Sequence, residues 1–211
     1  GLIVFAVPPE PGRSGLDAPP LSRLYELTVR PALLRLHVGM FAMHFMITAT
    51  FLAVPSVLVD DLGLASAGHW KVYLAVFVAS IAGMVPLVLA TERSRRGPAL
   101  LVLAIGLAAV SQAMLGGAHG HFWVVMAALT LFFAAFNYLE ARLPALLTLA
   151  APGAERGAAL GIFATAQFLG AFAGGALGGV LLGRFGLPGV FWGAAAVAAL
   201  FRYRSAFIRR G

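Results

Sequence analysis

Cysteine is absent from this chain, and charged residues are scarce. Charged side chains of both signs make up 11% of the 211 residues, and Asp and Glu together number 8. Soluble domains carry about 25% charged residues. The lack of cysteine excludes disulfide bonds, thiolate chemistry and cysteine-based metal sites. The scarcity of charge places the chain outside the class of soluble globular domains.

Motifs of membrane-embedded hydrolases are missing as well. There is no HExxH metal motif, and no GxSxG motif lies within an apolar run. His119 and His121 lie in a polar turn without a nearby carboxylate, which makes a poor metal site. We therefore expect no enzyme, no metal and no cofactor. The net charge of +7 is no evidence for a nucleic-acid partner, because arginine near the ends of membrane helices more often marks the side of the membrane on which a loop lies.

Apolar residues are abundant and account for 61% of the chain. A helix needs about 20 mostly apolar residues to cross a bilayer. Polar breaks divide the chain into six such runs, at residues 32–59, 70–91, 99–115, 122–150, 157–183 and 188–207. The predicted fold class is an all-α integral membrane protein whose six transmembrane helices form one bundle. Residues 21–30 have apolar residues at helical spacing among charges, which predicts a short interfacial helix.

Lysine and arginine fall mainly in alternate breaks between the predicted spans. One side of the membrane receives Arg13, Arg23, Arg30, Arg35, Arg93, Arg95, Arg96, Arg156, Arg202, Arg204, Arg209 and Arg210. The other side receives Lys71 and Arg184. The positive-inside rule then predicts that the segment before the first full span, the loop around Arg93 and the C-terminus are cytoplasmic.

Three polar side chains interrupt the fourth apolar run. Asn137 and Glu140 are three residues apart and share a helix face, whereas Arg142 points roughly the opposite way. Glu140 lies about 14 Å from the cytoplasmic end at the helical rise of 1.5 Å per residue. A charge at this depth costs about 2.5–3.5 kcal/mol on insertion scales, so Glu140 is either a protonatable cavity carboxylate or a structural one bonded to another helix. Arg142 can reach the interface or pair with Glu155.

The first apolar run holds one histidine near its middle. His44 shares a helix side with Thr48 and Phe51, and this stripe is a candidate lining for a cavity, with Thr48 as a cavity candidate and His44 as a candidate for proton coupling or for packing. Gln167 in the fifth run is read as an interhelical hydrogen-bonding residue. Aromatic residues at Phe41, Phe51, Phe133, Phe136 and Tyr138 would suit an amphipathic substrate, although such residues also face lipid.

Glycines recur every four residues in the fifth run. Gly170, Gly174 and Gly178 form one ladder, and Gly175, Gly179 and Gly183 form a second beside it. Together they predict a broad flat face for close helix packing, which either holds one static arrangement or also lets two parts of the protein rock against each other.

Several stretches resemble the C-terminal half of the major facilitator superfamily, in particular proton-coupled drug-efflux-type members. They are the loop ERSRRG with Glu92, Arg93, Arg95 and Arg96, and the runs FNYLEARLPAL, GAALGIFATAQFLGAFAGGALGG and GVFWGAAAVAAL. The loop keeps the acidic and basic residues of the family's motif but lacks its central glycine. The resemblance implies that residues 1–7 end a preceding transmembrane helix, 8–30 link two halves, and 31–211 form the C-terminal bundle.

The resemblance also implies a central cavity between two six-helix halves and transport by alternating access. The first and fourth helices of each half line that cavity in the family, which would place His44, Asn137 and Glu140 on it. The leading hypothesis is a secondary transporter, seen as a half or fragment, that exports a small or amphipathic molecule in exchange for protons. Its partners would be the lipid bilayer, the missing N-terminal half, the substrate and the proton. We expect it in a bacterial inner membrane.

Two alternatives remain open at this point. The chain could be a truncated membrane scaffold that transports nothing, or it could belong to an importer of a different solute.

Overall fold

The structure, a computed structural model, describes residues 19–93, 97–118 and 120–207. Every regular element in these ranges is helical, which confirms the predicted all-α class. The predicted helix tail at 1–7, the linker up to residue 18, and Arg95, Arg96 and His119 lie outside the described residues.

Six α-helices make up most of the described chain. They are α2 (Leu21–Val29), α3 (Pro31–Ser56), α4 (His69–Arg93), α5 (Gly97–Gly116), α6 (Phe122–Ala150) and α7 (Arg156–Phe207). Short helical turns join them, namely the π-helix η1 (Val57–Asp61) and the 3-10 turns η2 (Ser66–Gly68) and η3 (Gly153–Glu155). The short helix predicted at residues 21–30 is α2.

Five helical stretches of the described chain are long and apolar enough to cross a membrane by length and composition. The last stretch contains α7, whose 52 residues are interrupted at Gly186, where φ is 66°. That backbone conformation suits glycine because a Cβ would be strained there. The glycine divides α7 into two limbs, so the described chain supplies six apolar spans, as the sequence predicts.

The spans are helical because lipid offers no partner for a free backbone N–H or C=O group. Prolines inside the helices test this rule. Pro55 has no N–H group, so one backbone hydrogen bond of α3 is missing there. After one further residue the chain passes into the wider π-helix Val57–Asp61.

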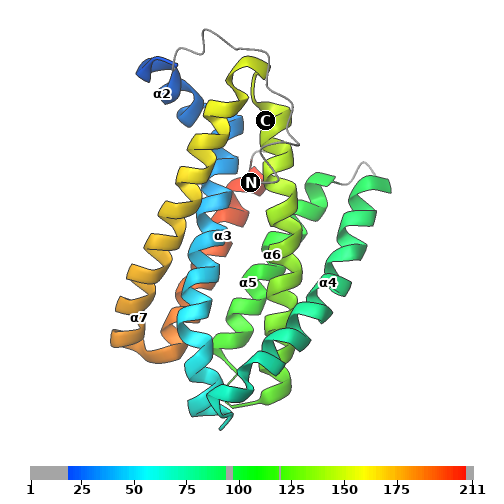
Figure 1. Ribbon diagram of the computed structural model, residues 1–211, viewed down its shortest axis with the longest axis vertical. Helices are drawn as coiled ribbons and strands as arrows, with labels where there is room; N and C mark the ends of the chain where they lie inside the picture. The colour runs from blue at the N-terminus through cyan, green and yellow to red at the C-terminus, as the bar shows by residue number, and fades with distance from the viewer. Residues whose placement is uncertain (1–18, 94–96, 119, 208–211) are drawn as a thin grey trace, which may run out of the picture.

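The spans run up and down, and α2 lies at one end of the bundle (Figure 1). Helix α3 packs most extensively against α7, and α4 packs against α6. Helix α5 contacts both α6 and α7, whereas α3 makes a smaller contact with α6. The bundle therefore consists of an α3–α7 unit and an α4–α6 unit, which α5 joins.

Helix α2 is attached to the bundle by an apolar contact and by an ion pair. Leu27 is 2% exposed and belongs to the core. Nη2 of Arg23 donates to Oε2 of Glu155 at 3.0 Å, Nε donates to Oε1 of the same carboxylate, and Glu26 accepts a third bond. The bonds to Glu155 and then Glu26 raise the pKa of the Arg23 guanidinium further above its ordinary value, so it stays charged. Of the two options for Arg142, pairing with Glu155 is not found, because Glu155 pairs with Arg23.

Candidate functional site

Helix α3 places His44 and Thr48 next to buried methionines. Met40, Met43 and Met46 are at most 1% exposed, whereas His44 and Thr48 are half-buried. The methyl group of Thr48 lies 3.6 Å from the position that a Cβ on Gly175 would take, so Thr48 faces α7.

The His44 ring is held by groups from three helices. Its Nδ1 lies 3.2 Å from the carbonyl oxygen of Met40, and its Nε2 lies 2.8 Å from Nε2 of Gln167 on α7. The Phe136 ring of α6 meets it edge to face, with ring centroids 5.8 Å apart. Gln167 therefore forms an interhelical hydrogen bond, and its partner is the histidine that the sequence marks as a coupling candidate.

Asn137 and Glu140 line one open pocket between α4 and α6. The pocket has a volume of about 390 Å³ and is also lined by Phe77, Ile81, Met84 and Ala141. Nδ2 of Asn137 donates to Oγ of Ser80 on α4 at 3.4 Å. The spacing of three residues thus brings the amide and the carboxyl group to the same pocket.

The Glu140 carboxyl group is only partly satisfied. Its Oε2 is buried and has no hydrogen-bond partner in the structure, and the side chain as a whole is half-buried. His44 lies on the same side of α6, because its ring contacts Phe136, one turn before Glu140. A carboxylate oxygen without a hydrogen-bond partner costs free energy away from water. Ionisable groups that are kept in membrane helices despite this cost typically exchange protons or bind ligands.

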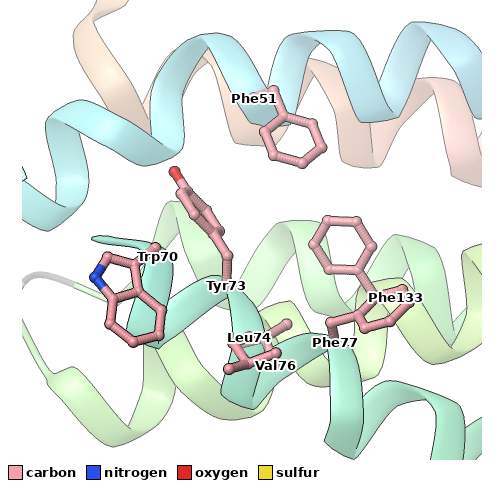
Figure 2. Close-up of a pocket in the computed structure, with 7 residues that line it drawn as sticks. All are labelled: Phe51, Trp70, Tyr73, Leu74, Val76, Phe77 and Phe133. Carbon is pink, nitrogen blue, oxygen red and sulfur yellow. The ribbon is translucent and has the colours of Figure 1, made fainter. Parts of the chain in front are cut away.

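A second and larger pocket is lined mainly by aromatic rings. Figure 2 shows Phe51 of α3, Phe77 of α4 and Phe133 of α6 among the residues that line it, and its volume is about 600 Å³. Trp70, Tyr73, Leu74 and Val76 complete its lining. Phe77 lines both pockets, so the aromatic pocket adjoins the pocket of Asn137 and Glu140.

The aromatic residues that the sequence offers divide between pocket and core. Phe51 and Phe133 line the aromatic pocket, and their rings lie 5.7 Å apart. Tyr138 is 1% exposed, and its hydroxyl lies 2.8 Å from that of Thr91. Sequence reasoning missed the contribution of α4, although its aromatic residues at positions 70, 73 and 77 fall at helical spacing.

The first glycine ladder packs directly on α3. A Cβ on Gly170 or Gly174 would overlap with the carbonyl oxygen of Phe41 or Phe45, and would lie 2.8 Å from the Cα atom of the same residue. A Cβ on Gly178 would lie 3.2 Å from Leu52. The helices therefore meet backbone to backbone.

The second glycine ladder behaves differently. A Cβ on Gly179 or Gly183 would find no atom within 4 Å. The expectation of one broad packing face was wrong, because the second ladder meets α3 only at Gly175, beside the Thr48 methyl group, and its other two glycines lie outside the helix contact.

The basic loop begins at the α2 end of the bundle. Glu92 and Arg93 are exposed in the last turn of α4. Glu92 and Arg142 line a small cavity of about 150 Å³ together with Thr91 and Tyr138. Among the residues that the structure describes, no group of three or more His, Cys, Asp or Glu side chains could hold a metal ion.

Comparison with known proteins identifies the class of this fold. The Major Facilitator Superfamily model matches residues 16–207, and the chain belongs to that family. With its apolar helices, this membership makes it an integral membrane protein.

Two curated relatives are named as transport proteins. The inner membrane transport protein YajR of Escherichia coli (strain K12) is 38% identical over 176 residues, which are 83% of this chain and 38% of the relative. The uncharacterized transporter BU466 of Buchnera aphidicola subsp. Acyrthosiphon pisum (strain APS) is 26% identical over 140 residues, which are 66% of this chain and 36% of the relative. The chain thus spans less than two fifths of the length of either relative.

Proposed function

We propose that the chain is the C-terminal half of a proton-coupled secondary transporter that exports a small or amphipathic molecule by alternating access. Family membership and the names of the two relatives support a transporter. The proposal places it in a bacterial inner membrane, with the linker and the C-terminus cytoplasmic. It assigns no catalysis and no metal to the chain.

The observation that carries the proposal is the environment of Glu140. One carboxylate oxygen is buried without a partner, beside a pocket of about 390 Å³ and one turn from Phe136, whose ring contacts His44. Negative charge without a partner is costly there, whereas the neutral carboxyl group is tolerated. Glu140 would therefore take up a proton from water while the pocket is open to the more acidic side of the membrane, and release it to water when the pocket opens to the other side.

Helix positions support the proposed cavity. The aromatic pocket and the Glu140 pocket are lined by α4 and α6, and α3 adds Phe51 to the first. Each is open on one side, so a second half is needed to enclose a substrate. Rocking of that half against this bundle would expose Glu140 alternately to the two sides of the membrane.

The test is uptake into everted membrane vesicles that contain this chain together with a matching first half. Uptake of the exported compound should require a proton gradient whose acidic side is inside the vesicle. Glu140→Gln should abolish this dependence on the gradient while the protein still inserts. Glu26→Gln is the matched control, because Glu26 lies on α2 and its partner Arg23 keeps Glu155.

Each of the other outcomes contradicts a stated part of the proposal. Gradient-driven uptake that survives in Glu140→Gln rules out the proton role of Glu140. Transport out of the vesicles instead of into them indicates an importer. The absence of transport by the complete protein indicates a scaffold.

A further inference from the structure

We propose that Gln167 is a positioning residue for the proton site, and that the orientation of its side-chain amide follows the protonation state of His44. The inference rests on the proposed function, in which His44 takes part in proton coupling. It concerns a residue that neither the family match nor the relatives assign to that task.

Nδ1 and Nε2 of His44 differ in which of them carries a hydrogen in the neutral ring. The Met40 carbonyl oxygen can only accept a hydrogen bond, so Nδ1 of His44, 3.2 Å away, carries a hydrogen. In the neutral ring Nε2 then has a free lone pair. The Gln167 side chain presents its NH₂ group at 2.8 Å and donates to that lone pair.

The second step follows when Nε2 takes a proton. Both ring nitrogens are then donors, and the NH₂ group of Gln167 faces another N–H. Rotation of the amide by about half a turn presents the side-chain oxygen instead, because the two ends of a Gln amide are nearly equal in size. The neutral ring thus fits one amide orientation and the charged ring fits the other.

The third step concerns the backbone that carries Gln167. Gln167 lies one turn before Gly170, whose backbone lies against that of Phe41 on α3. This close backbone contact keeps Gln167 and His44 in place relative to each other. We therefore infer that the amide adjusts by rotating in place.

The groups around His44 agree with this assignment. Phe136 of α6 and Gln167 of α7 are uncharged, and the Met40 carbonyl belongs to α3 itself. The ionisable group that α6 places nearby is Glu140, one turn beyond Phe136. Glu140 supplies negative charge to the protonated ring, while Gln167 supplies the hydrogen-bond acceptor.

Nitrogen-15 magnetic resonance of the histidine ring tests the proposal directly. The chain is labelled at histidine, joined with its first half and placed in lipid bilayers near neutral pH. The His44 signals are assigned by their loss in His44→Gln. The neutral ring should show Nδ1 protonated and Nε2 as a hydrogen-bonded acceptor, and a protonated Nε2 with a bare Nδ1 would overturn the proposal.

Two variants of Gln167 should move the Nε2 signal in opposite directions. Gln167→Met removes the donor, so the signal should shift away from that of a protonated nitrogen. Gln167→Glu brings an acceptor or a shared proton, so the Nε2 signal should shift toward that of a protonated nitrogen. Gln112→Met is the matched control, because Gln112 is a buried amide on α5 that donates to Thr50 of α3 at 2.8 Å.

The outcomes separate this inference from the proposed function. If neither Gln167 variant shifts the Nε2 signal, or if Gln112→Met shifts it equally, the positioning role is wrong and the transport proposal stands. If the shifts occur but His44→Gln leaves proton-driven uptake unchanged, the hydrogen bond is as described and His44 has no part in coupling.

Discussion

Helix α3 makes two unlike contacts with its neighbours. On one side it meets the first limb of α7 backbone to backbone at Gly170 and Gly174. On the other side its neighbours are the rings and polar groups of α4 and α6, which surround two open pockets. Close glycine contacts leave no space for a ligand, whereas aromatic and amide side chains leave cavities. The difference indicates that α3 and the first limb of α7 act as one unit, and the proposed function places the substrate on the other side.

The largest effect is expected from filling the glycine contact. Gly174→Leu forces a side chain against the Phe45 backbone, which cannot give way as a flexible side chain could. Stability should fall by about 3 kcal/mol or more, at or above the upper end of usual overpacking costs. The measurement is the thermal midpoint of the purified protein in detergent.

Gly179→Leu provides the matched control on the same helix. Nothing lies within 4 Å of its Cβ position, so we expect a change below about 0.5 kcal/mol. Equal losses in the two variants would contradict the distinction between the two ladders.

A smaller effect is expected at the pocket side of α3. Phe51 forms ring pairs with Tyr73 and Phe133, and each such pair contributes about 0.5–1.5 kcal/mol. Phe51→Ala should therefore lower stability by about 1–3 kcal/mol, and should weaken uptake at low substrate concentration.

Phe172→Ala tests whether this loss is specific to the pocket. Phe172 lies on α7 and is 74% exposed in this half. We expect its removal to change neither property appreciably. If Phe172→Ala weakens uptake as much as Phe51→Ala does, the aromatic pocket is not the preferred substrate site.

Spans and the spacing of polar groups could be predicted from sequence, because both depend on neighbours along one helix. Six apolar runs gave six spans, and the break around residues 184–186 is the turn at Gly186. Asn137 and Glu140 meet at one pocket because three residues make almost one helical turn.

Partners from other helices could not be predicted in the same way. Arg142 and Arg23 were both available to Glu155, and only the position of α2 against the loop before α7 selects Arg23. The two glycine ladders are alike in spacing, and the rotation of α7 decides which one meets α3. Likewise, the bond between Gln167 and His44 joins residues 123 positions apart.

Water access to the Asn137 side of α6 is the most direct test of the account. The chain contains no cysteine, so a single introduced thiol reports its own position when the first half carries none either. In the complete protein in membranes, Asn137→Cys should react with a charged, water-soluble thiol reagent, and Leu139→Cys, at a site that is 1% exposed, should not. If the thiol at position 137 reacts only with lipid-soluble reagents, that face does not line an aqueous pocket and the proposed proton site is wrong.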